Sequence, residues 1–343
     1  MDRREFLTSA SAAALVGCTI GGRIGDAQTA DIEYHVFSKM FQPPVTKSPE
    51  ELCELMKKAG FDGIQWTVRK GGYVDPANVA ADLPRLCRIA ESFGLKNRSI
   101  CTDITSDASG RPGLSDGAET ALRVAADCGI GMFRPAYFFY DAKNESFARS
   151  LERIRRGFAG LARLAERTGV KATYQNHSSW GPSVFGGLVW DVYECIRDLD
   201  PRHVGLEYDP MHAFFETNLS WTHGFDLVAP WISSVDLKDF HYCLDAKNEK
   251  MMKKAMVAAG DGVVPWKTVR DLVAAHGLRP LYIVHFEYDF DKSDLLKAVK
   301  TEVDAFRSVL ALNSERRSIP DGFCRQARAY RVTTVNCHSS GSL

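Results

Sequence analysis

The chain has 343 residues, of which 45% are hydrophobic and 25% charged, and Lys plus Arg balances Asp plus Glu at 43 each. This composition is typical of a globular protein, and the formal charge of zero argues against nucleic acid as the main partner, because phosphate binding normally leaves a basic excess or stripe. No apolar run reaches the roughly 18 to 20 residues that are needed to span a bilayer.

The first thirty residues predict an export signal. Arg3 and Arg4 form a twin-arginine pair ahead of the Ala-rich apolar stretch Ala10–Val16, which is the layout of a twin-arginine signal. The order Leu-Val-Gly-Cys that ends at Cys18 resembles a bacterial lipobox, in which the cysteine is lipidated; ordinary cleavage further along is the alternative. We expect residues 1–30 to be a signal and tether, and the protein to be periplasmic or held at the membrane only by a lipid on Cys18.

From Asp31 onward, short runs of β-branched and aromatic residues alternate with longer amphipathic stretches whose apolar residues recur at helical spacing. The predicted strands are Ile32–Ser38, Gly63–Val68, Leu95–Thr102, Met132–Tyr137, Lys171–His177, Val204–Tyr208, Ile232–Lys238 and Leu281–Glu287. The predicted helices are Pro49–Ala59, Val79–Phe93, Ala118–Cys128, Phe147–Thr168, Val189–Leu199, Trp266–His276 and Lys292–Leu312.

Signals at the ends of these helices support the assignment. Ser48 and Pro49 suit the start of a helix, and Gly60, Gly94 and Gly169 stand where a left-handed residue would end one. Eight strand–helix alternations imply a parallel sheet, and eight strands close a barrel, so we predict an α/β fold, the (β/α)8 or TIM barrel. A doubly wound sheet is disfavoured because no glycine-rich phosphate turn follows the first strand.

The barrel is predicted over residues 31–312 as one domain. Beyond it the periodicity stops, and residues 313–343 are polar and rich in Ser and Arg. We expect this segment to be a poorly ordered tail that adds little to the core.

Polar side chains gather at the carboxyl ends of the last four predicted strands, where a barrel of this kind places its active site. Strand alternation puts pairs of them on one face: Gln175 with His177, Asp236 with Lys238, and His285 with Glu287. Burying so many polar groups at one mouth is costly unless they bind something. The sequence therefore predicts a ligand site at this end of the barrel.

Six short segments stand at these positions and nearby: Val68–Val74, Tyr174–His177, Tyr208–Ala213, Leu237–Phe240, Gly260–Trp266 and His285–Tyr288. Their order and placement resemble the xylose-isomerase-like superfamily of sugar phosphate isomerase/epimerase barrels, over residues 31–312. The resemblance implies an enzyme that acts on a small carbohydrate.

The resemblance also implies a site for one divalent metal. Members of the superfamily bind it with Glu, Asp, His and Glu on the last four strands, and the corresponding positions here are Gln175, Asp209, Asp236 and Glu287. These all-oxygen ligands suit Mg²⁺ or Mn²⁺ better than Zn²⁺. The family's second histidine corresponds to His212, which would contact substrate oxygens.

The departures from the family pattern bear on mechanism. Epimerisation next to a carbonyl needs a base on one face of the carbon and an acid on the other, and in the family two Glu side chains supply them. Gln175 cannot exchange a proton at neutral pH, whereas a one-base isomerisation, or β-elimination from an oxidised sugar, needs only one strong base. The candidate proton carriers are Glu287, His177, His212 and Lys238. The candidate substrate contacts are Arg69, Arg134, Trp180 and His285.

These inferences favour a metal-assisted isomerase or epimerase that acts on a carbohydrate or keto-sugar, with a lyase on oxidised glycosides as a variant. The alternative is a non-catalytic periplasmic sugar-binding lipoprotein that keeps the pocket. An endonuclease of the same superfamily is disfavoured by the neutral charge and the export signal. The sequence leaves open which sugar is bound and whether the protein is a homo-oligomer.

Changing Arg3 and Arg4 to Lys should leave the precursor in the cytoplasm, because the export machinery reads the arginine pair. Cys18→Ala should release the exported protein into the soluble periplasmic fraction, since a lipid would have no attachment site. Cell fractionation with immunoblotting measures both outcomes. A Cys18→Ala protein that stays with the membrane would contradict the lipoprotein prediction.

Overall fold

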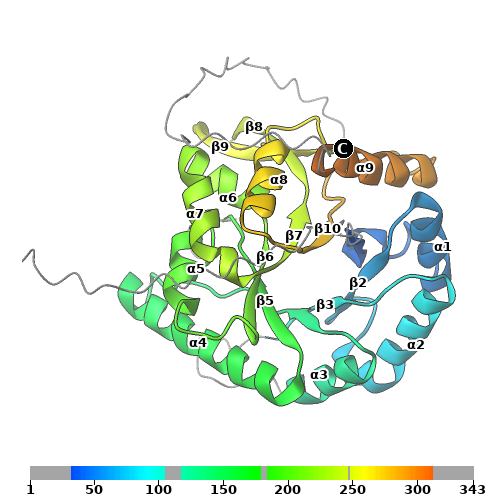
Figure 1. Ribbon diagram of the computed structural model, residues 1–343, viewed down its shortest axis with the longest axis horizontal. Coiled ribbons are helices and arrows are strands. Elements are labelled where there is room, and N and C mark those ends of the chain that lie inside the picture. Colours follow the sequence, from blue (N-terminus) through cyan, green and yellow to red (C-terminus); the bar gives the residue numbers. More distant parts are fainter. Residues whose placement is uncertain (1–31, 105–116, 179–183, 246–247, 312–343) are drawn as a thin grey trace, which may run out of the picture. The chain divides into compact units, whose positions relative to one another are not determined.

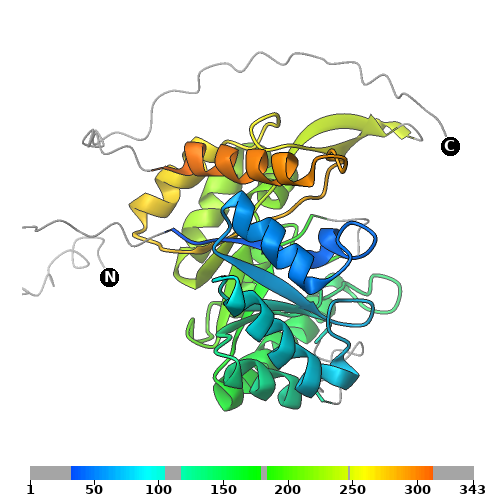
Figure 2. The same ribbon diagram turned by 90° about the vertical axis from the view of Figure 1, so that its right-hand side faces the viewer.

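The structure, a computed structural model, describes residues 32–104, 117–178, 184–245 and 248–311 (Figures 1 and 2). The predicted export signal with Cys18, the predicted tail and Trp180 lie outside these residues. No helix within the described ranges is long and apolar enough to cross a membrane.

Eight parallel strands close into a barrel, with helices packed around its outside (Figure 1). The strands follow one another around the barrel in chain order. The eighth is labelled β10 because β8 and β9 form a separate two-stranded sheet. Their bounds are β1 Tyr34–Phe37, β2 Gly63–Val68, β3 Ser99–Thr102, β4 Met132–Arg134, β5 Lys171–Gln175, β6 Val204–Tyr208, β7 Ile232–Leu237 and β10 Leu281–Val284. The predicted (β/α)8 barrel is confirmed, and each predicted strand contains an observed one.

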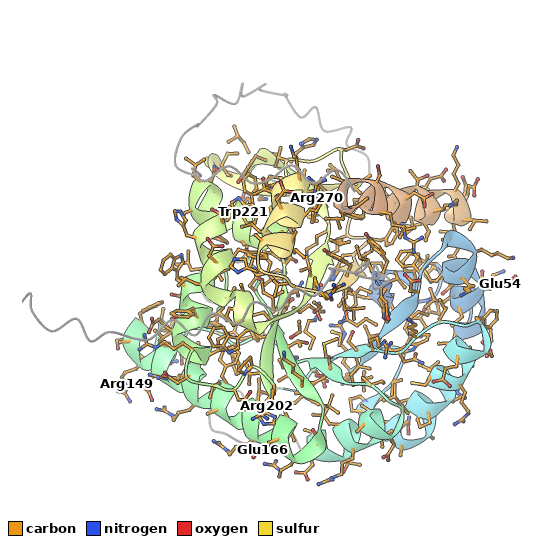
Figure 3. The ribbon with its side chains drawn as sticks, in the orientation of Figure 1. Glu54, Arg149, Glu166, Arg202, Trp221 and Arg270 are labelled. Atoms are coloured by element: carbon orange, nitrogen blue, oxygen red, sulfur yellow. The ribbon has the colours of Figure 1, made fainter. Side chains whose placement is uncertain are left out.

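The outer layer is built from α1 Pro49–Ala59, α2 Val79–Ser92, α3 Ala118–Asp127, α4 Phe147–Thr168, α5 Val189–Ile196, α6 Pro210–Thr217, α7 Trp221–Val228, α8 Trp266–Ala275 and α9 Leu295–Leu310. Short 3-10 turns occupy Ser38–Phe41, Pro76–Asn78, Asn218–Ser220 and Ala229–Trp231. No helix was predicted where α6 and α7 lie. Charged side chains such as Glu54, Arg149 and Glu166 point outward from these helices (Figure 3), so the opposite faces pack on the barrel.

The predicted helix ends follow from local chemistry. The Ser48 hydroxyl accepts the Glu51 N–H and caps α1. Gly60 and Gly169 have φ of 99° and 73° and end α1 and α4 in the left-handed conformation that favours glycine. These caps fix where each helix turns back toward the base of the next strand.

An antiparallel hairpin between β7 and α8 was not predicted. Its strands, β8 Asp239–Asp245 and β9 Asn248–Val257, pair with each other and not with the barrel. Figure 1 shows the hairpin near α6. Phe240 and Tyr242 of β8 pack on Phe214 and Phe215 of α6, so β8 has an apolar face. The alternating pattern does not continue into β9, where Lys253 and Lys254 stand next to each other.

The carboxylate of Asp239 anchors the hairpin to the barrel. It accepts the backbone N–H groups of Gly260 at 3.2 Å and Val264 at 3.1 Å, and the indole N–H of Trp266 at 3.1 Å. A Cβ at Gly262 would lie 1.9 Å from an oxygen of this carboxylate, so only glycine fits there. One buried carboxylate therefore joins the base of the hairpin to the start of α8.

The interior of the barrel contains an apolar cluster of its own, distinct from the main core between strands and helices. Phe37, Cys101, Leu281 and Ile283 are buried in it, and Met132 packs against them. Phe37 also contacts the two polar side chains of Arg134 and His285. This cluster is thus in direct contact with the polar side chains described below.

A second buried carboxylate ties α9 to the segment after the hairpin. Both oxygens of Glu302 accept the Ala259 N–H, at 3.1 and 3.0 Å, and Oε2 also accepts the Tyr288 hydroxyl at 2.8 Å. Burial raises the pKa of Glu302 to about 7. Between its ordinary value of 4.5 and this value, the folded chain holds a proton that the unfolded chain releases.

Stability should therefore fall as the pH rises from about 4.5 to about 7, because ionising Glu302 costs more in the folded state. Glu302→Gln should remove this loss and raise the free energy of unfolding near pH 8 by about 3 kcal/mol. Urea denaturation at about pH 5 and about pH 8 measures the difference, with exposed Glu166→Gln as the matched control. An equal effect of Glu302→Gln at both pH values would show that ionisation is not the cause.

Candidate functional site

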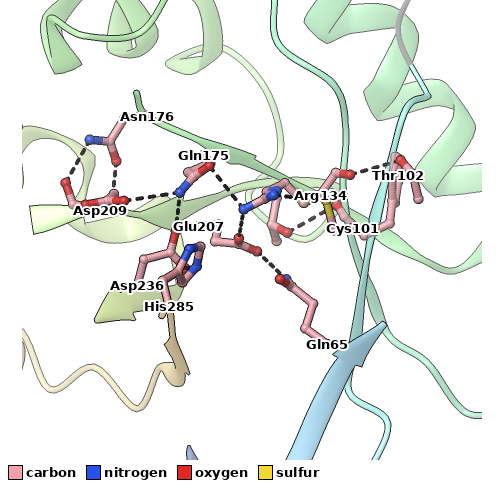
Figure 4. Close-up of polar contacts among 12 residues, drawn as sticks. Gln65, Cys101, Thr102, Arg134, Gln175, Asn176, Glu207, Asp209, Asp236 and His285 are labelled. Atoms are coloured by element: carbon pink, nitrogen blue, oxygen red, sulfur yellow. Dashed lines mark hydrogen bonds and ion pairs between the residues drawn. The ribbon is translucent and has the colours of Figure 1, made fainter. Parts of the chain in front are cut away.

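Strand ends around the barrel bring buried polar side chains together in its interior (Figure 4). This polar network consists of Gln65, Arg134, Gln175, Glu207, Asp209, Asp236, Lys238 and His285, each no more than 5% exposed. They meet because every second residue of a barrel strand points inward. The network contains predicted site residues from the ends of five strands, together with Gln65 and Glu207, which sequence reasoning did not single out.

Arg134 is held by protein groups on three sides. Its Nη1 donates to Glu207 Oε1 at 3.0 Å and to Gln175 Oε1 at 3.1 Å, and its Nη2 lies 3.0 Å from Cys101 Sγ. Gln65 Nε2 donates to the other oxygen of Glu207 at 2.8 Å. Burial, and then the charge of Asp236, raise the pKa of Glu207 to about 7 in spite of Arg134. The guanidinium that was predicted to contact substrate thus also balances a buried carboxylate.

The ammonium group of Lys238 lies between two of the carboxylates that were predicted to bind a metal, Asp209 and Glu287. Its Nζ is 3.0 Å from Asp209 Oδ2 and 3.4 Å from Glu287 Oε2. Lys238, and then His285, hold the pKa of Glu287 well below its usual range although burial opposes them. Glu287 is 27% exposed, which makes it more accessible than Asp209.

The amide of Gln175 is turned so that its nitrogen faces the carboxylates. Nε2 donates to Asp209 Oδ2 at 3.1 Å and to Asp236 Oδ2 at 2.5 Å. The amide oxygen, which is the atom predicted to bind a metal, accepts from Arg134 and from the Tyr137 hydroxyl. Gln175 thus joins the carboxylates to Arg134.

A different group of side chains offers atoms for a metal. One ligand atom each of Glu207, Asp236 and His285 lies within 4.8 Å of the others, and all three residues are buried. Among the described residues, Asp236 Oδ1 and His285 Nε2, which are 3.2 Å apart, have no hydrogen-bond partner. Although burial opposes it, the charge of Asp236 and the hydrogen bond with Glu287 raise the pKa of His285. This triad can hold a divalent cation, and it shares only Asp236 with the predicted set.

The two predicted proton-carrying histidines stack on each other, with ring centroids 3.7 Å apart. His177 Nδ1 is 2.7 Å from the backbone oxygen of Ser178, and His212 Nδ1 is 2.6 Å from the Ser178 hydroxyl. Burial, and then the charge of Lys238, lower the pKa of His177 to about 3 and that of His212 well below its usual value. Both imidazoles are therefore neutral at physiological pH.

Sequence reasoning missed two residues at this mouth. Ser178 is buried and contacts His212, and Lys254 reaches it from β9 with an ammonium that donates to the Ser178 hydroxyl. Ser178 follows the predicted strand end by one residue, which was a usable signal, but nothing in the sequence places β9 over the barrel. Arg69, at the end of β2, is half-buried with Nη1 3.9 Å from Cys101 Sγ, so it lies near the network without joining its ion pairs.

A cavity of about 540 Å³ is walled by side chains from outside the network. Its polar and aromatic lining includes Tyr140, Glu145, Phe147, Asp191 and Glu216. Aromatic faces and carboxylates are the side chains that suit sugar rings and their hydroxyl groups. Glu216 also interacts electrostatically with Lys254, which links the cavity to the mouth of the barrel.

Comparisons with known proteins agree with this architecture. Residues 53–309 match the model of the family described as xylose isomerase-like TIM barrel. No curated protein matches the chain.

Solved structures with the same fold include sugar epimerases. The apo 3-keto-D-glucoside 4-epimerase of E. coli has 14% identity and a TM-score of 0.60, covering 81% of this chain and 100% of its own. The D-psicose 3-epimerase of Clostridium cellulolyticum H10, solved with D-tagatose, has 12% identity and a TM-score of 0.60 over 82% and 100%. A xylose isomerase-like barrel protein of Mycobacterium smegmatis, in complex with magnesium, has 14% identity and a TM-score of 0.55 over 82% and 97%. At these identities the likeness shows the fold.

Proposed function

The chain belongs to the xylose isomerase-like TIM barrel family, and we propose that it is an enzyme of the sugar isomerase and epimerase kind. Its substrate is a carbohydrate or keto-sugar, and its reaction moves a proton next to a carbonyl. The observation that carries this proposal is the Lys238 ammonium beside Glu287 at the barrel mouth. The sugar epimerases among the structural neighbours support the same class.

In the proposed mechanism Glu287 is the base. Its carboxylate is ionised and partly exposed, so it can take a proton from the carbon next to the carbonyl. Lys238 holds its charge close by and would stabilise the enediolate oxygen that forms as the C–H bond breaks. His177 and His212, both neutral, would contact sugar hydroxyl groups and not supply charge.

We also propose that a divalent metal, Mn²⁺ or Mg²⁺, takes part. Glu207, Asp236 and His285 would hold it, because Asp236 Oδ1 and His285 Nε2 face each other at 3.2 Å and, among the described residues, accept or donate no hydrogen bond, whereas Lys238 bridges Asp209 and Glu287. The imidazole ligand favours Mn²⁺ over Mg²⁺, because Mg²⁺ is held by oxygen ligands and follows Mn²⁺ in affinity for nitrogen. When bound, the metal would supply Lewis-acid stabilisation of charge on a substrate oxygen.

The finer proposals concern substrate size and location. The cavity beside the mouth has room for a second sugar ring, which favours a glycoside over a free monosaccharide. Export by the twin-arginine route with a lipid on Cys18 would place the enzyme where glycosides are met.

The function is tested by incubating the protein with keto-sugars and glycosides in deuterium oxide. Wild type should convert at least one sugar and exchange a carbon-bound proton with solvent, as read by NMR and mass spectrometry. Glu287→Gln should lower both rates by about 10² to 10⁴, because it removes the base. Asp289→Asn, two residues away and 99% exposed, is the control. Saturable sugar binding without conversion or exchange would instead support the sugar-binding alternative.

The metal is tested by calorimetric titration of chelator-treated protein with Mn²⁺. Asp236→Asn and Glu207→Gln should weaken binding by at least about tenfold, while Asp209→Asn should change it by less than about threefold. Gln175→Glu should tighten binding, since it adds a carboxylate beside Asp236. If only Asp209→Asn loses Mn²⁺ affinity, the metal is held by the residues predicted from the sequence and not by the triad. Equal affinity in all variants would exclude both sites.

A further inference from the structure

The hairpin brings a lysine to the barrel mouth that makes no ion pair with any described carboxylate. Lys254 lies on β9, and its ammonium donates to the Ser178 hydroxyl and stands 4.5 Å from the centre of the Phe215 ring on α6. Among the side chains that the structure describes, no carboxylate comes within ion-pair distance of this ammonium. By contrast, the next residue, Lys253, is 54% exposed and pairs with Asp245 at 2.9 Å.

The surroundings of Lys254 suit proton transfer. Because Lys254 donates to the Ser178 hydroxyl, that hydroxyl is left to donate to His212 Nδ1, 2.6 Å away, and neutral His212 can accept. Burial, and then the like charge of Lys238, lower the pKa of Lys254. A lysine held in one place with a lowered pKa is the kind of amine that enzymes use as an acid or base.

The proposed reaction lacks such a group on one side. An epimerase needs a proton carrier on each face of the reacting carbon, and the Gln175 amide cannot act as a proton carrier. Glu287 follows β10 and contacts Lys238. Lys254 instead contacts Ser178, which follows β5, and Phe215 on α6, so it approaches the mouth from the side of β5, three strands around the barrel from β10.

We propose that Lys254 is the second acid–base residue of this enzyme, on the face of the substrate opposite Glu287. The inference rests on the proposed function and deepens it. Glu287 takes the proton from one face, and the C–H electron pair becomes the enediolate. The enediolate carbon then takes a proton from the Lys254 ammonium on the other face, so that one N–H bond breaks as one C–H bond forms. Solvent returns a proton to the amine and accepts one from Glu287.

The test compares Lys254→Ala and Lys254→Arg with Lys253→Ala, in deuterium oxide, on a sugar that wild type converts. Both Lys254 variants should lose at least about 100-fold in kcat with KM changed by less than about threefold, since guanidinium does not release a proton. Recovered substrate should still gain deuterium, because the proton on Glu287 exchanges with the solvent and Glu287 then returns a deuteron to the same face. Added ethylamine should restore conversion by Lys254→Ala in proportion to its concentration, and Lys253→Ala should match wild type.

Three results would overturn the inference. The first is a Lys254→Ala kcat within about threefold of wild type. The second is a joint loss of conversion and deuterium uptake without amine rescue, which would give Lys254 a structural role. The third is a wild type that neither converts nor exchanges any sugar, which contradicts the proposed function and removes the inference with it.

Discussion

Four carboxylates, Glu207, Asp209, Asp236 and Glu287, lie in the mouth of one barrel, and the rest of the site depends on how their charge is balanced. An unpaired ion in a dry interior costs of the order of several kcal/mol, so the fold must supply cations at the same level. Arg134 contacts the first of the four, Lys238 contacts the second and fourth, and His285 lies beside the third. Each cation comes from a different strand end, so this balance exists only when the barrel is closed.

The same balance of charge sets a different protonation state for each titratable group at the mouth. Lys238 keeps the partly exposed Glu287 ionised, as a base must be, whereas burial beside that cation keeps His177 and His212 neutral. Glu207, buried and paired with Arg134, has its pKa raised to about 7, so binding of a cation would release its proton to solvent. Proton abstraction, contact with sugar hydroxyl groups and metal binding can thus belong to separate residues at one barrel mouth.

The sequence was sufficient for the barrel and for the end at which its polar side chains gather, because alternation, helix caps and the order of polar strand ends are local properties. It was not sufficient to predict which side chains form hydrogen bonds with one another inside the barrel. The bond between Gln65 and Glu207 joins residues 142 positions apart, and it depends on strand register around the closed barrel. The orientation of the Gln175 amide depends in turn on where Arg134 and Asp236 lie. The hairpin was not predicted because the alternating apolar pattern of β8 does not continue into β9, which is rich in lysine.

Gln175 shows how one departure from the family pattern constrains the whole mouth. A glutamate at this position would place a fifth carboxylate within hydrogen-bond distance of Asp209 and Asp236. Like charges so close together are stable only when one of them is protonated or a divalent cation is bound. The glutamine amide instead donates to both carboxylates and accepts from Arg134, so the network is balanced by the chain's own groups. The cost is a lost proton carrier. A replacement inside the network would add charge where it is already balanced, so it is better supplied from the rim, and the hairpin brings Lys254 to that rim.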